Sequence, residues 1–355
     1  MMNKKRVLIS GGSGFLGGYL VDHLLYRGGY TIVVFDKLEF SSSRNYQKDL
    51  QYIQGDILSK QNVKKVFHLY GPFHTVFHLA SAMPDKAISD QATWETNVTG
   101  TVNVVSEAVR YGTESFIFTS SNVTYGIPQF LPVTETTPAH PLEVYGKSKL
   151  EAEHLLETYK KRIHIQIFRC PVVTGVGRLG LQSILFEFIS ENRNVYVLGD
   201  GLNKYQFVDA IDVCTALEKA SYKQGFDIYT IGGDGVMTIK ELYQKVIDSA
   251  RSSSKIVPLP KAPALAVLWL LDRLNISPLG VYQYTMLSRS MYADTSKIKK
   301  QLRWKPKKTN AQSFIENYQW YVHNKKTFRG RGKSNLSANR SLVKMKAFKL
   351  LKILS

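Results

Sequence analysis

The sequence predicts an α/β fold, in which a doubly wound parallel sheet is followed by a smaller, mixed C-terminal region. Short runs rich in β-branched residues alternate with helical patterns through the first half of the chain, as expected for parallel strands joined by crossover helices. A glycine-rich turn joins the first run to the first helical pattern. After Pro171 the pattern becomes less regular, and this second region is expected to cap the strand ends and build a substrate pocket.

Six strands are expected in the first region, which is the number that a doubly wound dinucleotide-binding sheet requires. The predicted strands are Arg6–Ser10, Thr31–Phe35, Leu50–Gln54, Thr75–Leu79, Ser115–Thr119 and Ile163–Phe168. The predicted helices are Phe15–Tyr26, Asn62–Tyr70, Thr93–Tyr111, Leu142–Lys160, Leu181–Asn192, Asp209–Ser221 and Thr238–Ala250. We therefore expect a Rossmann domain at 1–171, a substrate-binding region at 172–324 from which some of the chain returns to the sheet, and a basic tail at 325–355.

Composition indicates an ordinary globular protein. At 355 residues and 44% hydrophobic, the chain can bury a large core in one big or two coupled domains. Its two cysteines, Cys170 and Cys214, cannot form a disulfide framework, which favours a reducing compartment such as the cytoplasm. The longest apolar run, Ala262–Leu271, is far shorter than the ~20 residues that cross a bilayer. This run is expected to be a buried helix; the alternative is a pocket wall or membrane-facing lip for a lipid-like alcohol.

The net charge of +19 is concentrated at the C-terminus, where the chain from Lys325 onward holds ten Lys and Arg residues and no acid. Arg329–Ser341 has the composition of a disordered linker. Ser341–Leu354 spaces apolar residues at helical intervals opposite lysines, which is typical of an amphipathic helix on an anionic membrane; a solvated, frayed tail is the alternative. Nucleic acid is not an expected partner, because the tail after the linker contains a single aromatic residue, Phe348.

The turn after the first strand has the features of a dinucleotide-binding loop. It reads SGGSGFLG over residues 10–17, which fits both G-x-x-G-x-x-G and G-x-G-x-x-G. Glycines let the backbone turn tightly and approach a pyrophosphate, and the helix N-terminus attracts the phosphates. The predicted cofactor contacts in this loop are Gly11, Gly12, Gly14, Phe15, Leu16 and Gly17.

Acidic residues follow the second and third strands at the same edge of the sheet. A carboxylate at Asp36 can accept both hydroxyls of an adenosine ribose and would repel a 2′-phosphate, so NAD is the favoured cofactor. Lys37 and Arg44 leave NADP open. Asp56, followed by Ile57, is placed to reach the adenine amino group.

The fourth strand ends in His78-Leu79-Ala80-Ser81, whose small residues suit close approach of the cofactor. We therefore add Leu79 and Ala80 to the predicted cofactor contacts. His78 itself lies in an apolar strand and is expected to be a packed, hydrogen-bonded core residue.

Tyr145 and Lys149 form the candidate catalytic pair. A helix at Leu142–Lys160 places them one turn apart on the same face. A free phenol has a pKa near ~10, and a nearby ammonium favours the phenolate and lowers that pKa. The fifth strand leads into hydroxyls at Ser120 and Ser121, at the edge where ligands bind in such folds. The alternatives are a tyrosine packed on a lysine stem and a pair of capping hydroxyls.

The chain thus contains, in this order, a glycine loop, an acidic residue at a strand end, a serine at a strand end and a Tyr/Lys pair. In this combination it resembles an extended short-chain dehydrogenase/reductase of the NAD-dependent epimerase/dehydratase family. The resemblance extends from Arg6 to about Tyr321. It includes Asn97-Val98-Thr99-Gly100-Thr101, Ser121-Asn122-Val123-Thr124-Tyr125-Gly126, Gly199-Asp200-Gly201, Phe207-Val208-Asp209 and Leu302-Arg303-Trp304-Lys305-Pro306.

The resemblance implies hydride transfer between the nicotinamide of the cofactor and a carbon that bears a hydroxyl. Tyr145 would be the general acid/base, and Ser121 would orient the substrate hydroxyl. Lys149 would hold the nicotinamide ribose while lowering the tyrosine pKa, so Tyr145 and Lys149 would both contact the cofactor. Asn97 and Pro171 would lie beside it. In an epimerase, the ketone turns over in the pocket and regains the hydride on its other face.

Some positions depart from the family pattern. A 4,6-dehydratase carries an Asp-Glu pair just after the catalytic hydroxyl, whereas this chain has Asn122-Val123, which argues against a dehydratase. UDP-sugar epimerases usually carry an asparagine and an Arg-Asp pair that bind the diphosphate. The corresponding segments here read RCPV at 169–172 and YQFVD at 205–209, without either group. Arg178, Lys204 and Arg289 are candidates to replace them.

We expect an NAD-dependent epimerase or oxidoreductase acting on a secondary alcohol, with a nucleotide-linked sugar as the favoured substrate. The rival within this class is a dehydrogenase/reductase of a sterol-like or lipid-linked alcohol, of the 3-beta-hydroxysteroid dehydrogenase type. The rival from another class is a non-catalytic cofactor-binding scaffold whose tail binds membrane or nucleic acid. Expected partners are the small-molecule substrate, a second copy of the chain in a homodimer, and an anionic membrane at the tail; no metal is expected.

Overall fold

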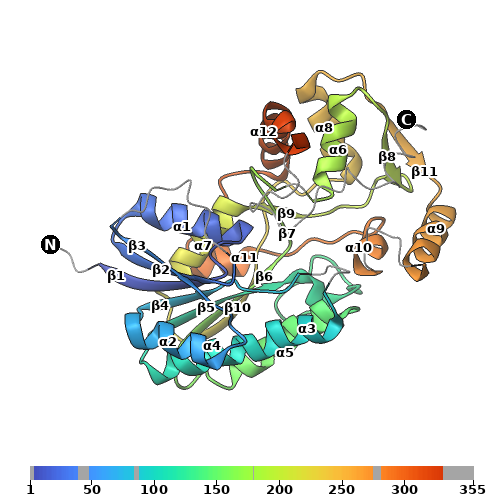
Figure 1. Cartoon of the computed structure of the whole chain (residues 1–355). Helices are drawn as coiled ribbons and strands as arrows, with labels where there is room; N and C mark the ends of the chain where they lie inside the picture. The colour runs from blue at the N-terminus through green and yellow to red at the C-terminus, as the bar shows by residue number, and fades with distance from the viewer. Residues whose placement is uncertain (1–3, 39–47, 84–87, 179, 275–280, 331–355) are drawn as a thin grey trace.

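The protein contains a seven-stranded parallel sheet in the order β10-β6-β5-β4-β1-β2-β3 (Figure 1). The computed structural model describes residues 4–38, 48–83, 88–178, 180–274 and 281–330. The strands of the sheet are β1 (Lys5–Ser10), β2 (Tyr30–Asp36), β3 (Leu50–Gln54), β4 (Thr75–His78), β5 (Ser115–Ser121), β6 (His164–Cys170) and β10 (Phe226–Thr230). Because β1 pairs with both β2 and β4, the strand order reverses there. The predicted doubly wound sheet is confirmed, and ligands of such sheets bind at this reversal.

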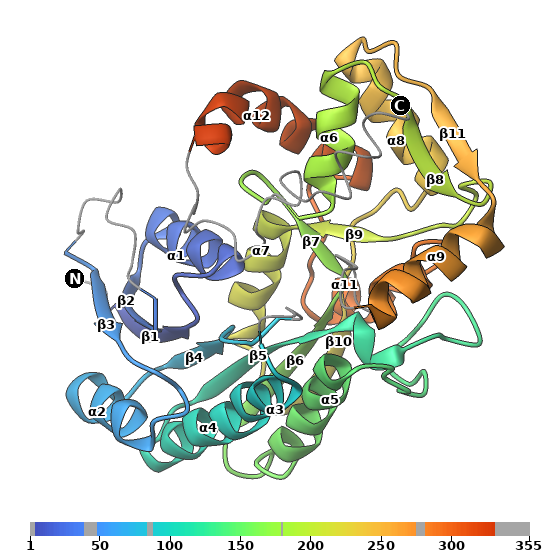
Figure 2. The same cartoon turned by 45° about the vertical axis from the view of Figure 1, so that its right-hand side comes forward.

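Helices cover both faces of the sheet (Figures 1 and 2). One face is covered by α1 (Phe15–Arg27), α7 (Ala210–Ala220) and α11 (Ser296–Gln301), and the other by α2 (Lys60–Tyr70), α4 (Gly100–Arg110) and α5 (Val144–Glu157). The central strands are therefore buried on both sides, as their continuous apolar runs require. Short helical segments lie between the helices of this second layer in the sequence: α3 (Asp90–Trp94) and the π-helical η1 (Glu95–Thr99) come directly before α4, and the 3-10 turn η2 (Asn122–Tyr125) lies between β5 and α5.

His78 is confirmed as a hydrogen-bonded core residue. It is fully buried at the end of β4, and its two ring nitrogens bond to the hydroxyls of Ser10 at 2.6 Å and Thr101 at 3.0 Å. Burial lowers the pKa of His78 to about 3, so the ring is neutral at physiological pH.

Two differences from the predicted elements have local causes. The helix predicted at Thr93–Tyr111 is interrupted by the π-helical turn η1, which no hydrophobic period reveals. Strand β10 lies at the edge of the sheet, where it pairs with β6. The strand is short, Phe226–Thr230, and lacks the long apolar run of a central strand. The sequence pattern therefore does not predict it.

The remaining chain builds a second lobe above the sheet (Figure 2). It contains α6 (Gln182–Ser190), α8 (Ile239–Ala250) and α12 (Asn310–Gly330), which share one apolar core. Two small parallel pairs complete it, β8 (Val195–Leu198) with β11 (Ile256–Leu259) and β7 (Val172–Thr174) with β9 (Phe207–Asp209). The α9 (Lys261–Arg273) and α10 (Val281–Met286) helices follow β11.

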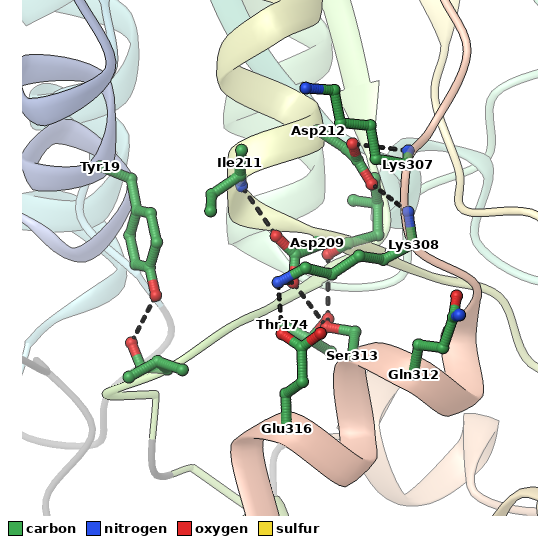
Figure 3. Close-up of polar contacts among 12 residues, drawn as sticks. Tyr19, Thr174, Asp209, Ile211, Asp212, Lys307, Lys308, Gln312, Ser313 and Glu316 are labelled. Carbon is green, nitrogen blue, oxygen red and sulfur yellow. Dashed lines mark hydrogen bonds and ion pairs between the residues drawn. The ribbon is translucent and has the colours of Figure 1, made fainter. Parts of the chain in front are cut away.

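A polar network joins α7 of the sheet domain to the start of α12 (Figure 3). Asp209 caps α7 by accepting the N–H of Ile211 at 3.0 Å, and it also accepts the hydroxyl of Ser313 at 2.8 Å. One turn further along, the carboxylate of Asp212 accepts the N–H groups of Lys307 at 2.8 Å and Lys308 at 3.1 Å. The two carboxylates thus hold the segment before α12 and the first turn of α12 against the N-terminal end of α7.

The α9 helix contradicts the expectation that the apolar run 262–271 is buried. Each of its described side chains is exposed or half-exposed, and none belongs to an apolar core of the described residues. The helix follows β11 at the edge of the second lobe (Figure 1). Among the described residues, no helix combines the length and hydropathy needed to cross a membrane.

Part of the predicted tail is ordered. The α12 helix continues to Gly330, and Lys325 forms an ion pair with the buried Glu187 at 2.9 Å. The helix therefore includes the first six residues of the predicted basic tail and the first two of the predicted linker. The rest of the predicted linker and the predicted amphipathic helix, 331–355, lie outside the described residues.

Candidate active site

The glycine-rich loop between β1 and α1 forms a tight turn that is open at its tip. Gly11 has a φ of +80°, and a Cβ there would come within 2.5 Å of the Ala80 nitrogen. A Cβ on Gly17 would come within 2.1 Å of the Gly11 carbonyl oxygen. At Gly14, the N-cap of α1, a Cβ would meet the Gly11 oxygen alone, and no side chain caps the helix. The N-terminus of α1 is thus left open to an anion such as a pyrophosphate.

The other predicted residues of the loop surround this opening. A Cβ on Gly12 would come within 2.7 Å of the Val34 side chain, so glycine lets the loop pack on β2. Phe15 and Leu16 begin α1 and pack partly on the core. Leu79 donates its N–H to the Ser10 carbonyl at 2.9 Å, which brings the chain after β4 against the loop.

Asp36 lies at the end of β2 with its carboxylate directed at the loop. It accepts the N–H of Ser13 at 2.9 Å and of Leu38 at 3.0 Å. Burial raises the pKa of Asp36, and these hydrogen bonds oppose that shift. Lys37 is exposed, whereas Arg44 lies outside the described residues. The predicted contact of Asp36 with ribose hydroxyls fits this placement and stays a prediction.

Asp56 and Ile57 occupy the turn between β3 and α2. The Asp56 carboxylate accepts the N–H of Leu58 at 2.8 Å, and the Asn62 side chain accepts the N–H of Asp56 at 3.1 Å. Ile57 is buried, and a Cβ on Gly100 would come within 2.5 Å of its side chain. Asp56 thus shapes this turn, and its contact with adenine stays a prediction.

Asn97 ties the chain after β4 to the catalytic helix. Its side-chain oxygen accepts the N–H of Ala82 at 2.8 Å and the hydroxyl of Ser81 at 3.0 Å. Its side-chain nitrogen donates to the Ser148 hydroxyl of α5 at 3.0 Å. Asn97 sits in the π-helical turn η1, and such turns occur frequently at functional sites. Through Asn97, Ser81 is held beside Tyr145, a placement that the sequence did not indicate.

Tyr145 lies buried in the first turn of α5, with the hydroxyls of Ser121 and Ser81 as hydrogen-bonding neighbours. Burial raises the pKa of Tyr145 to about 12, while these two hydroxyls and the positive charge of Arg178 oppose the shift. The net shift is thus opposite to the lowering expected at the catalytic tyrosine, because desolvation outweighs the favourable neighbours. The phenol is therefore protonated at neutral pH.

Lys149 is buried one turn beyond Tyr145 at the end of β5. Its ammonium donates to the Thr119 carbonyl at 3.0 Å and lies 4.7 Å from the centre of the Phe118 ring. Burial lowers the pKa of Lys149 to about 8, although the nearby Cys170 and Glu153 raise it. The hydrogen bond to Thr119 thus holds the ammonium in place, and the surrounding groups offset only part of the cost of burying its charge.

Replacing Lys149 by methionine is expected to remove a pH-dependent cost of folding. The lysine titrates near 10.5 when unfolded and near 8 when buried. Between these values the unfolded chain binds a proton that the folded chain has released, so the stability of the wild-type protein relative to Lys149→Met rises with pH. The cost is complete below pH 8 and absent above 10.5.

Denaturant unfolding of both proteins across this pH range measures the difference between their free energies of unfolding. A difference that is constant with pH, or that changes in the opposite direction, would contradict the buried, depressed pKa of Lys149.

A buried ion pair supports this edge of the sheet, and sequence reasoning missed it. Glu153 of α5 accepts hydrogen bonds from the Arg169 guanidinium of β6 at 2.7 and 3.1 Å and a further one from the Ser120 hydroxyl. Both charged groups are nearly fully buried. The four-residue spacing of Lys149 and Glu153 puts both on one face of α5, but the partner Arg169 lies on a strand and no local pattern in the sequence identifies it.

Arg178 is the one of three candidate cations that the structure brings to Tyr145. Its guanidinium lies 5.2 Å from the centre of the Phe15 ring in the cofactor loop, and its charge opposes the raised pKa of Tyr145. Lys204 and Arg289 are exposed on neighbouring segments of the second lobe. Arg178 thus lies between the glycine loop and the catalytic tyrosine.

The segments that lack the family's diphosphate-binding groups have structural roles. Pro171 is buried directly before β7, and Val172 begins that strand. Gln206 is buried, donates to the Gly233 carbonyl at 3.0 Å and accepts the N–H of Ala293 at 2.8 Å. These contacts use the amide of Gln206 within the protein.

Comparisons with known proteins agree with this geometry. The model of the NAD dependent epimerase/dehydratase family matches residues 7–232. The uncharacterized protein y4nG of Sinorhizobium fredii is 36% identical over 349 residues, which cover 98% of this chain and 85% of that protein. The UDP-glucose 4-epimerase of Bacillus subtilis is 26% identical over 359 residues, which cover 90% of this chain and 97% of that enzyme.

The enzyme WbmG of Bordetella bronchiseptica, solved in complex with NAD and UDP, has the same fold. It matches with a TM-score of 0.72 at 22% identity, over 90% of this chain and 94% of WbmG. The family match covers the glycine loop, Asp36, Ser121, Tyr145 and Lys149. The chain therefore belongs to the NAD-dependent epimerase/dehydratase family of extended short-chain dehydrogenases/reductases, and it is an enzyme that uses NAD.

Proposed function

We propose that the protein moves a hydride between NAD and a secondary alcohol of a nucleotide-linked sugar, and that it acts as an epimerase. The observation that carries the proposal is the meeting of Tyr145 with Ser121 at the carboxyl edge of the sheet, one turn from the buried Lys149. This group lies beside a glycine loop that is shaped to admit a pyrophosphate. Such sites occur where the strand order of a doubly wound sheet reverses.

Each side chain has a distinct task in this reaction. NAD, when bound, supplies the hydride acceptor at its nicotinamide ring. Tyr145 takes the hydroxyl proton of the substrate and later returns it, and Ser121 donates a hydrogen bond to the same oxygen as negative charge develops. Lys149 would hold the nicotinamide ribose, and its positive charge would favour the phenolate against the cost of burial.

Arg178 supports an anionic substrate. The structure places this cation beside Tyr145, while Gln206 is occupied by contacts within the protein. A guanidinium can bind two oxygens of a phosphate at once. Arg178 is therefore our candidate for binding the substrate diphosphate that the usual family residues would bind. Asn122 and Val123, next to Ser121, provide no acid for the elimination of water.

A direct assay tests this function. Purified protein with NAD is incubated with UDP-sugars, and the sugars are separated by chromatography. We expect one sugar to be converted to its epimer with no net formation of reduced cofactor, because the hydride returns to the same substrate. If no UDP-sugar is interconverted and none protects the protein from thermal unfolding, the nucleotide-sugar proposal fails.

A lipid-linked alcohol is the second candidate, and the occupied amide of Gln206 favours it. A net dehydrogenase accumulates reduced cofactor in proportion to oxidised alcohol, whereas an epimerase does not. The balance of cofactor against product therefore separates the two candidates in one experiment.

A further inference from the structure

The α9 helix presents an apolar surface that nothing in the described part of the chain covers. Ten apolar residues lie in a row between Lys261 and Asp272. The outward side chains recur at helical intervals, and Val267, Trp269 and Leu270 are 56%, 50% and 51% exposed. Such exposure of neighbouring large side chains marks an interaction site, since single apolar residues are normally scattered on a surface.

The opposite side of α9 meets the protein only partly. Leu265, Leu268 and Leu271 are half-buried at a spacing of three residues, so this side faces the second lobe and α10. Ordinary surface helices turn an apolar stripe inward and a charged face outward. In α9 the outward face is also apolar, so its contact with water is energetically unfavourable.

The charges around α9 are almost all positive. The segment 251–273 contains four cations and one acid. The cations Arg251, Lys255, Lys261 and Arg273 are all exposed, and the Arg273 guanidinium stacks 4.9 Å from the centre of the Trp269 ring. An apolar helix with tryptophan and flanking cations is the composition that binds the surface of an anionic bilayer.

We propose that α9 is a docking helix that inserts its outward face, centred on Val267, Trp269 and Leu270, into the surface of an anionic lipid bilayer. Its 13 residues span about 20 Å at 1.5 Å per residue, so it lies in the interface and does not cross. A second copy of the chain fits this face less well. An antiparallel pair of α9 helices would bring Lys261 of each next to Arg273 of the other.

Docking by α9 would place the active site close to the bilayer. The α10 helix packs beside α9, and the N–H of Tyr282 in α10 donates to the carboxylate of Glu143 at 2.7 Å. Glu143 is the N-cap of α5, two residues before Tyr145. The same short segment thus contacts both the docking helix and the start of the catalytic helix.

Flotation of the full-length protein with lipid vesicles tests the proposal. The probes are vesicles of phosphatidylcholine mixed with phosphatidylglycerol, and vesicles of phosphatidylcholine alone. The test variant is Leu270→Glu, and the matched control is Leu69→Glu, an equally exposed leucine (55%) on α2. Both variants lose the same side chain and gain the same charge, so any contribution of the basic C-terminus is equal in the two.

We expect the wild-type protein and Leu69→Glu to float with the anionic vesicles. Leu270→Glu should bind them at least about tenfold more weakly, because tenfold corresponds to about 1.4 kcal/mol, which is less than burial of one leucine side chain contributes. Retained binding of NAD by Leu270→Glu would show that the variant is folded.

Two results would overturn the proposal. Equal binding of Leu270→Glu and Leu69→Glu would assign the membrane contact to another part of the chain. No vesicle binding by the wild-type protein, together with a lower mass of Leu270→Glu in sedimentation, would make α9 an interface between two copies.

Discussion

Replacing Tyr145 by phenylalanine is expected to reduce turnover by about 10²- to 10⁴-fold, the usual contribution of a positioned acid/base group. The variant loses the hydroxyl that lies beside Ser121 and Ser81 but keeps the buried ring. We therefore expect its affinity for NAD and its fold to be retained. Steady-state turnover and NAD binding by calorimetry, on the same preparation, measure the two effects.

The control for this variant is Tyr30→Phe. Tyr30 is also buried and hydrogen-bonded, but its hydroxyl contacts Glu218 and Tyr222 on the other side of the sheet domain. Turnover should be unchanged in Tyr30→Phe. Equal activity of Tyr145→Phe and the wild-type protein would remove Tyr145 from the chemistry and favour a scaffold that binds the cofactor without using it.

Replacing Glu153 by alanine is expected to destabilise the fold by about 3–5 kcal/mol, because the buried Arg169 would lose its partner. The guanidinium is hydrogen-bonded to Glu153 through two nitrogens, and both side chains are almost inaccessible to water. Denaturant unfolding measures the loss. The matched control is Glu157→Ala on the same helix, where the ion pair to Lys160 is about half exposed and contributes less than about 1 kcal/mol.

A double variant, Glu153→Leu with Arg169→Met, distinguishes loss of the pair from exposure of one charge. Removing both charges leaves no unpaired ion, so the double variant should be more stable than Glu153→Ala. The interpretation fails if Glu153→Ala loses no more stability than Glu157→Ala. It also fails if the double variant loses as much stability as the separate changes at Glu153 and Arg169 added together.

The sheet could be predicted from the sequence because its information is local. Strands β1 to β6 are short apolar runs, most of them separated by helical patterns, and each can be identified within its own residues. The same holds for the glycine loop and for Tyr145 and Lys149, whose spacing is fixed by one turn of helix. These features need no knowledge of distant contacts.

The features that escaped prediction depend on distant partners. Strand β10 is stabilised by pairing with β6, and the Glu153–Arg169 pair joins a helix to a strand. The raised pKa of Tyr145 follows from burial by surrounding chain, which a spacing of tyrosine and lysine does not report. The α9 helix is the clearest example. An apolar run predicts that its side chains are buried, but it does not indicate whether protein or lipid buries them.

The most direct test of the proposed chemistry is rapid mixing of NAD-loaded protein with a nucleotide sugar deuterated at the reacting carbon, followed by the absorbance of reduced nicotinamide. We expect enzyme-bound reduced cofactor to form, to form more slowly from the deuterated than from the ordinary sugar, and to be lost in Tyr145→Phe. Formation of the epimer without any reduced cofactor, or at a rate that does not respond to deuterium or to Tyr145→Phe, would contradict hydride transfer assisted by Tyr145.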